Sequence, residues 1–114
     1  MSLSVFLQRL RETPAQIEFA ETIAAIESHY DYTPTAFRNG GVENAAGQNG
    51  GSCKIFAFAK LQNLDESETL ACFGRYYRDD VLQNPDASDH QNIRTFMRSG
   101  WSGIAFAGEA LRVR

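Results

Sequence analysis

The sequence contains little cysteine and no long hydrophobic run. Its two cysteines, Cys53 and Cys72, are too few for a disulfide framework, and their apolar neighbours predict reduced, buried thiols in a cytoplasmic protein. No apolar stretch approaches the roughly 20 residues that a membrane-spanning helix needs. The first residues also lack the basic and apolar regions of a secretory signal peptide. We therefore exclude a disulfide-stabilised secreted domain and expect no membrane association.

Positive charge is scarce as well. Eleven basic residues stand against fourteen acidic ones, the net charge is −3, and no basic block is present. Nucleic acid is therefore not an expected partner, because general binding depends on many contacts between basic side chains and phosphates. Only two of the basic residues are lysine. The arginines favour specific ion pairs or anion contacts, because a guanidinium binds a carboxylate or phosphate through two parallel hydrogen bonds.

The rest of the composition fits one globular domain over residues 1–114. Hydrophobic residues make up 43% of the chain, and eight Phe, four Tyr and one Trp are enough for a single core. Apolar residues recur at helical spacing in several stretches: residues 3–11, a stretch opened by Thr13-Pro14 that runs to Tyr30, residues 53–61, a stretch capped by Asp65 that ends before Pro85, and a stretch capped by Ser88 or Asp89 that ends at Gly100. We expect a mainly α fold, a compact bundle of about five helices with a long ordered loop and room for a minor strand pair.

The long loop, Asn39–Ser52, is the most unusual stretch. Residues 39–51 hold five glycines and three asparagines, which favour turns and cannot form a core by themselves. We expect the loop to be ordered, because Tyr32-Thr33-Pro34 precedes it and a buried helix follows it. A short strand is expected around residues 36–38. Ser52 is expected to cap the apolar helix over 53–61, for which a buried strand over 54–58 is the alternative.

Two motifs are more specific than the others: Gly-Ser-Cys-Lys-Ile-Phe at residues 51–56 and His-Gln-Asn-Ile-Arg at residues 90–94. Through these and several further motifs spread over nearly the whole chain, the sequence resembles the HopJ family, named after a type III effector of plant-pathogenic bacteria. The resemblance implies a compact bacterial protein that carries a type III effector label, for which type III secretion is a route out of the cytoplasm. It transfers no catalytic residue.

Cys53 is the sharpest candidate for chemistry. In the first turn of a helix, the dipole would lower the pKa of its thiol and backbone amides could hold an oxyanion. His90 lies downstream, next to Asp89 and near Asn92, so a Cys-His-Asp/Asn constellation can be assembled from the chain. The alternative, which we favour, is that Cys53 is a small buried residue at a tight packing point.

An anion or small-molecule site at the long loop is a second candidate. Backbone N–H groups at a helix start form a ready anion site, and the residues that we assign to it are Asn39, Asn44, Asn49, Ser52, Lys54 and Arg94. The structural alternative is that the asparagines bond their own backbone and hold the loop in order. The acidic pair Asp79-Asp80 is interpreted as ion-paired with Arg75 and Arg78 on a helix surface.

The spacing of histidines and acids matches no compact metal-binding signature, so we expect no metal and no other cofactor. The leading hypothesis for function is a non-enzymatic interaction protein with a host or bacterial protein as partner. The alternative is a small enzyme or an anion- or ligand-binding protein that uses the Asn39–Ser52 loop with Cys53 and His90. The sequence leaves the oligomeric state open.

Overall fold

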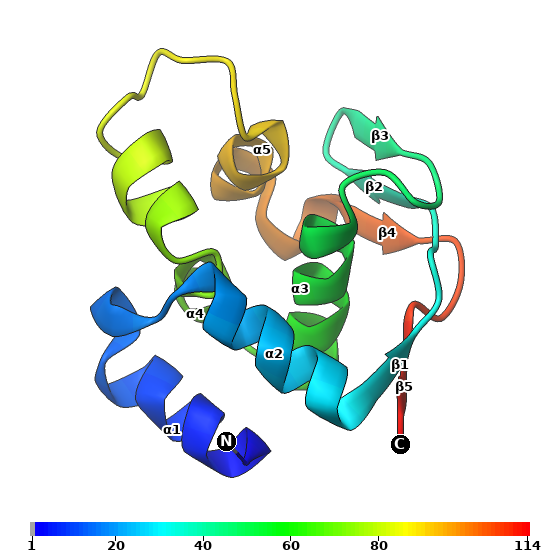
Figure 1. The fold of residues 1–114 in the computed structure, drawn as a ribbon. Coiled ribbons are helices and arrows are strands. Elements are labelled where there is room, and N and C mark those ends of the chain that lie inside the picture. Colours follow the sequence, from blue (N-terminus) through cyan, green and yellow to red (C-terminus); the bar gives the residue numbers. More distant parts are fainter. Residues whose placement is uncertain (1) are drawn as a thin grey trace.

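Helix α3 (Gly50–Leu61) lies at the centre of the molecule, as its almost wholly apolar sequence predicts. The computed structural model describes residues 2–114, and Figure 1 shows the other elements arranged around α3. In chain order these are α1 (Leu3–Glu12), η1 (Pro14–Gln16), α2 (Phe19–His29), β1 (Tyr30–Tyr32), β2 (Phe37–Asn39), β3 (Val42–Asn44), then, after α3, α4 (Glu66–Ala71), η2 (Tyr76–Val81), α5 (Gln91–Ser99), η3 (Gly100–Gly103), β4 (Ile104–Phe106) and β5 (Leu111–Val113). Within residues 2–114, none of the helices has both the length and the apolar character needed to cross a membrane.

The helix predicted over residues 53–61 is confirmed, and the alternative of a buried strand is wrong. Six residues of α3 are buried: Cys53, Ile55, Phe56, Ala57, Phe58 and Ala59. A helix that is apolar on nearly every side needs cover on every side, and the surrounding elements supply it. The helix begins at Gly50, however, with Asn49 as its N-cap, so the prediction of Ser52 as the cap is wrong.

The helix predicted to start at Thr13 begins later. Ser2 caps α1, but after Thr13 the chain makes only the 3₁₀ turn η1. Ile17 is extended and fully buried, and its burial takes the chain out of helical geometry. A capping box between Glu18 and Glu21 then opens α2.

The single helix predicted after Asp65 is broken at Gly74. α4 begins with a capping box between Asp65 and Glu68, as expected. The chain then turns at Gly74, whose φ is +61°, and a Cβ there would lie 2.6 Å from the backbone nitrogen of Phe19. This position therefore requires glycine for its conformation and for the close approach of α2. The chain resumes as η2, which is a π-helix. π-Helices are rare in proteins, and those that occur often lie at functional sites.

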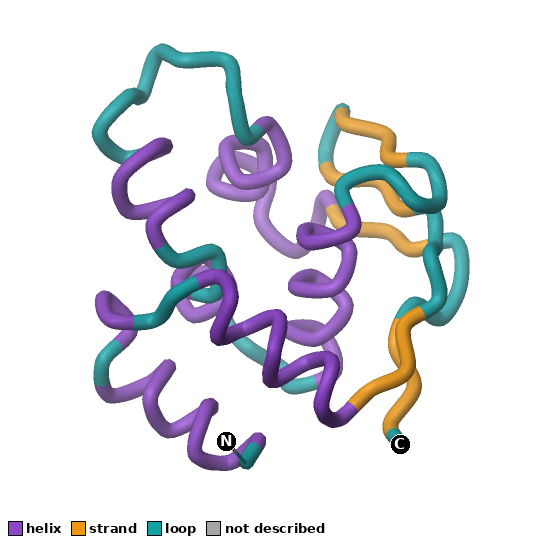
Figure 2. The backbone as a smooth tube through the Cα atoms, in the orientation of Figure 1, coloured by secondary structure: helices purple, strands orange, loops and turns teal. Residues whose placement is uncertain are grey.

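The strands form two antiparallel sheets, which is more than the predicted minor pair. β1 pairs with β5, and the second sheet has the order β3-β2-β4 (Figure 2). β2 overlaps the strand predicted around residues 36–38. β4 and β5 escape prediction because their partners are distant in sequence: Phe106 pairs with Phe37, and Val113 with Tyr30. The predicted long loop thus divides into three parts: residues 39–44 belong to the β2–β3 hairpin, residues 45–49 connect the hairpin to α3, and residues 50–52 form the start of α3.

An aromatic cluster around Phe56 joins α3 to the larger sheet and to α5. The ring centroid of Phe56 lies 6.0 Å from that of Phe37 in β2, 5.5 Å from that of Phe73 and 5.0 Å from that of Phe96 in α5. Trp101 in η3 packs edge-on against Phe56 at 6.4 Å. This packing fixes α5 relative to α3, and the space between the beginnings of these two helices is the site described next.

Candidate anion site between two helix starts

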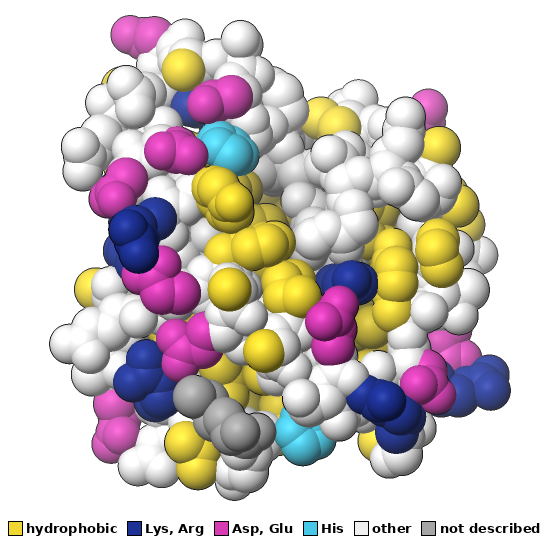
Figure 3. Space-filling model, viewed as in Figure 1, with side chains coloured by type: hydrophobic (Ala, Val, Ile, Leu, Met, Phe, Trp, Pro, Cys, Tyr) yellow, Lys and Arg dark blue, Asp and Glu magenta, His cyan; other side chains and the backbone are white. Residues whose placement is uncertain are grey.

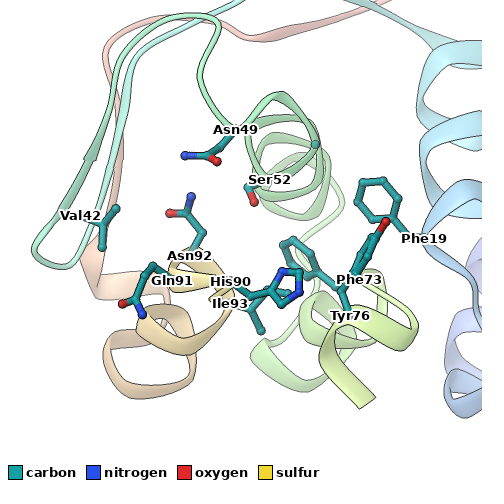
Figure 4. A pocket seen from close by; sticks show the side chains of 11 residues that line it. Phe19, Val42, Asn49, Ser52, Phe73, Tyr76, His90, Gln91, Asn92 and Ile93 are labelled. Carbon is teal, nitrogen blue, oxygen red and sulfur yellow. The ribbon is translucent and has the colours of Figure 1, made fainter. Parts of the chain in front are cut away.

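A cavity of about 330 Å³ lies between the beginnings of α3 and α5 (Figure 4). Its wall is polar on the side of the two helix starts and largely apolar on the side of α2 and η2. The residues that line it are Phe19, Val42, Asn49, Gly51, Ser52, Phe73, Tyr76, His90, Gln91, Asn92 and Ile93.

Both helices at the cavity begin after a residue with left-handed backbone conformation. Asn49 precedes α3 and His90 precedes α5, each with a φ of 51°, and neither side chain caps its helix. Neither first turn contains an acidic residue. The first amide groups of each helix have no partner inside the helix, and no carboxylate in the same turn offsets their partial positive charge. The cavity therefore lies at the positive ends of two helix dipoles, an arrangement that favours an anion.

Four asparagines hold the two helix starts together. The side-chain amide of Asn39 donates to the backbone carbonyl of Asn92 over 2.8 Å. The side-chain oxygen of Asn44 accepts from Asn49 at 2.6 Å and from Asn92 at 3.0 Å. Asn39 and Asn44 are 0% and 3% exposed. The asparagines assigned from the sequence therefore bond mainly to one another and to Asn92 across the fold, and of the three only Asn49 lines the cavity.

The imidazole of His90 is held by two side chains of η2. Its Nε2 lies 3.0 Å from Oδ2 of Asp80, whereas the predicted partner Asp89 is 3.9 Å away. The ring of Tyr76 packs against it with 5.2 Å between centroids. An ionised carboxylate only accepts hydrogen bonds, so this contact assigns the hydrogen of a neutral imidazole to Nε2 and leaves Nδ1 as the acceptor nitrogen. Figure 4 shows the His90 ring and the Ser52 side chain on opposite sides of the same cavity.

Cys53 does not share this cavity with His90. Its side chain is 1% exposed, and Sγ donates to the carbonyl oxygen of Thr35 over 3.5 Å. Burial raises the pKa of the Cys53 thiol, although a hydrogen bond with Tyr32 acts in the opposite direction. The predicted lowering of this pKa is therefore wrong. Because α3 begins at Gly50, the helix directs Ser52 to the cavity and Cys53 to the core.

Both thiols are expected to resist iodoacetamide in the folded protein. Burial raises the pKa of Cys53, and it raises the pKa of Cys72 to about 12. Only the thiolate reacts, so both its scarcity and its burial protect these residues. Intact-mass spectrometry should show no adduct in buffer and adducts on both cysteines after denaturation. Rapid modification of the native protein that disappears in Cys53→Ala would show instead that Cys53 is a reactive thiol.

The charged candidates Asp89, Arg94 and Lys54 are engaged outside the cavity wall. The Arg94 side chain is 6% exposed and donates to the carbonyl oxygens of Asn84 at 2.8 Å and Asp89 at 2.6 Å. It also bonds the Asp89 carboxylate at 2.7 Å, which holds the pKa of Asp89 below its usual range. Lys54 pairs with Glu27 at 3.1 Å. Across the described part of the chain, no group of three or more His, Cys, Asp or Glu side chains is placed to hold a metal ion.

Tyr76 and Asp80 contribute to the site although the sequence patterns do not single them out for it. Tyr76 is 43% exposed and lines the cavity. Asp80 reads as part of a surface ion-pair cluster, but Arg75 and Arg78 pair with Glu18 instead, at 3.0 Å and 3.4 Å. The glycine inside the apolar pattern of this segment is the one local signal that the helix breaks before these residues.

Fold and site together define a small, mainly α domain with two short sheets and a cavity at two helix starts. The profile of the HopJ type III effector protein family matches residues 3–111, and the chain belongs to this family, which confirms the resemblance seen in its motifs. The fold is similar to the crystal structure of unknown function protein VPA0580, with a TM-score of 0.99 and 55% identity over 100% of this chain and 95% of that chain. A comparison with curated proteins gave no match.

Proposed function

We propose that this protein binds a small organic anion in the cavity between α3 and α5. The observation that supports this function is the convergence of two uncapped helix starts, free of first-turn acids, on one cavity. An anion there would accept hydrogen bonds from amides that have no intrahelical partner, at residues 50–52 and 91–93. The side chains of Asn49 and Ser52 add polar groups on the same wall.

The other wall supports a ligand with an apolar part next to its charge. The rings of Phe19 and Tyr76 meet edge to face with 5.1 Å between centroids, and Phe73 extends this wall, while the Ile93 side chain of α5 adds a further apolar group to the lining. On the face seen in Figure 3, apolar side chains gather beside a histidine. The volume, about 330 Å³, falls at the lower end of the range for small-molecule sites, about 300–1,000 Å³. The ligand that fits is a carboxylate or phosphate ester with a small apolar or aromatic group.

A non-enzymatic interaction protein, the leading hypothesis from the sequence, has less support and stays a prediction. Apart from Tyr76 at the cavity, the exposed large apolar side chains of the described residues come from separate segments of the chain: Val5, Leu61, Leu82, Met97 and Val113. Exposed apolar residues are ordinary on a protein surface and do not by themselves mark an interface. Type III secretion, which the family description implies, is proposed here only as a route by which the ligand-binding domain would reach a host cell.

Benzoate is expected to raise the melting temperature of the protein. A ligand at 100 times its Kd stabilises the folded state by about 2.7 kcal/mol, which corresponds to a rise of roughly 10 °C for a domain of this size. Differential scanning fluorimetry measures the shift. Benzamide, which has the same ring without the charge, should leave the melting temperature unchanged, and inorganic phosphate tests whether the anionic group alone suffices.

Ser52→Asp tests whether the shift arises in this cavity. The new carboxylate would occupy the helix start, abolish the benzoate shift, and stabilise the free protein by roughly 0.3–1 kcal/mol through the helix dipole. Ser4→Asp is the matched control, because Ser4 is exposed in the first turn of α1 and does not line the cavity. The proposal fails if benzoate gives no shift, or if Ser52→Asp keeps a shift as large as that of Ser4→Asp.

A further inference from the structure

We infer that His90 acts as a general base in this cavity and that the protein hydrolyses small carboxylic esters there. The inference rests on the proposed anion site, because the oxyanion formed during the reaction and the acid released by it would both occupy that site. Its structural basis is an oriented imidazole that faces hydrogen-bond donors across a cavity.

Asp80 and Tyr76 orient the imidazole from the protein side. The 3.0 Å contact between Asp80 Oδ2 and Nε2 fixes the hydrogen on that nitrogen, and the Tyr76 ring packs against the imidazole at 5.2 Å. The side chain of His90 is 28% exposed, so it contacts η2 and still reaches the cavity. Nδ1 keeps a lone pair that can take a proton. A carboxylate that orients one ring nitrogen while the other moves the proton is the division of roles that acyl-transfer catalysis uses.

Ser52 and the start of α3 supply the donors on the other side of the cavity (Figure 4). The Ser52 hydroxyl and the first-turn amides can donate to an oxygen that gains negative charge during the reaction. Gly51 is part of this arrangement because a Cβ at that position would lie 2.7 Å from Cζ of Phe19. The absence of a side chain at position 51 thus lets the aromatic wall approach the amides closely.

The reaction needs only water as a second reactant. Nδ1 of His90 takes a proton from water while the water oxygen bonds to the carbonyl carbon of the ester. The carbonyl oxygen becomes an oxyanion and accepts hydrogen bonds from Ser52 and the α3 amides. When this intermediate collapses, the bond from carbon to the alkoxy oxygen breaks, and the leaving alkoxide takes the proton from the imidazolium. The products are a carboxylic acid and an alcohol, and nothing is oxidised or reduced.

His90→Asn tests the base directly, with p-nitrophenyl acetate as the probe substrate. Asparagine tolerates the left-handed conformation at this position but cannot take the proton. We expect kcat to fall about 100-fold, the lower limit for losing a general base, with little change in melting temperature. The matched control is His29→Asn, because the other histidine of the chain ends α2 and lies outside the cavity. Added imidazole should restore part of the activity of His90→Asn, which a purely structural role would not allow.

Asp80→Asn tests the positioning residue. We expect kcat to fall on the order of 10-fold or more while KM stays unchanged, because Asp80 orients His90 and does not touch the substrate. The inference is overturned if the wild-type protein is no faster than His90→Asn, or if His29→Asn loses as much activity as His90→Asn. A benzoate shift without His90-dependent hydrolysis would support the anion site and contradict the esterase activity. Hydrolysis that requires His90 without any benzoate shift would contradict the anion site and support His90 as the general base.

Discussion

Replacement of Phe56 by alanine is expected to lower the free energy of unfolding by about 3–5 kcal/mol. The Phe56 side chain is 0% exposed, and its ring packs against those of Phe37, Phe73 and Phe96 with 5.0–6.0 Å between centroids. Alanine removes the buried ring and leaves a cavity at the point where α3, α5 and the larger sheet meet. Urea denaturation followed by circular dichroism measures the loss.

The total free energy of unfolding of an ordinary domain is about 5–15 kcal/mol, so Phe56→Ala can leave a substantial unfolded fraction. Phe56→Leu keeps the prediction measurable, with an expected loss of about 1–2 kcal/mol. Leu61→Ala is the control in the same helix, because Leu61 is 53% exposed and its truncation should change the free energy of unfolding by about 0.5 kcal/mol or less. Equal effects at positions 56 and 61 would contradict the central place of Phe56.

Replacement of Arg94 by methionine is the second change with a large expected effect, and it should lower the free energy of unfolding by about 3 kcal/mol or more. The buried guanidinium donates to backbone carbonyls of Asn84 and Asp89 and to the Asp89 carboxylate. Methionine preserves much of the side-chain volume but leaves these carbonyls without their charged donor. Arg98→Met is the matched control on the same helix, because Arg98 is exposed and its side chain makes a single long hydrogen bond within the described residues, to Thr95 at 3.4 Å. Its expected change is within about 0.5 kcal/mol.

The contact between Arg94 and Asp89 also has a defined pH dependence. Arg94 lowers the pKa of Asp89 in the folded state. The contribution of this contact is therefore fully present above the pKa of an unfolded aspartate, about 3.9, and is lost as the pH falls through the lower pKa of the folded state. Urea titrations at several pH values should show the difference between wild type and Asp89→Asn shrinking below about pH 4. A difference that stays constant down to acidic pH would show that the ion pair is not its source.

Local patterns predicted the helices whose apolar faces and caps are encoded side by side. α1 begins after Ser2, and α4 begins with the Asp65 capping box, because each signal needs only four or five neighbouring residues. The same reasoning failed where tertiary contacts override local preference. Gly74 breaks an apolar pattern that continues on both sides, because the backbone of α2 approaches it closely. The partners of β4 and β5 lie some 70 to 80 positions upstream, beyond any local pattern.

A small error in the predicted start of α3 changes which residue is assigned a chemical role at the site. A start at Cys53, after a Ser52 cap, would place the thiol in the first turn. The observed start at Gly50 places Ser52 in that turn and buries Cys53. Because each residue in a helix turns by about 100°, the exact start decides which neighbour faces the cavity. The left-handed conformation of Asn49, which sets this start, depends on contacts with Asn44 that the sequence does not display.

The pairing of β1 with β5 and of β2 with β4 has a consequence for how the molecule is made. Both sheets join a strand from the first part of the chain to one from the last ten or so residues, as in the pairs Tyr30 with Val113 and Phe37 with Phe106. Contacts of this kind form slowly, because a long loop must close before they stabilise anything. During synthesis, α1, α2 and α3 emerge before β4 and β5, so β1 and one edge of β2 stay unpaired until those two strands have been made. The nascent chain is therefore most exposed to mispairing and aggregation before β4 and β5 are synthesised.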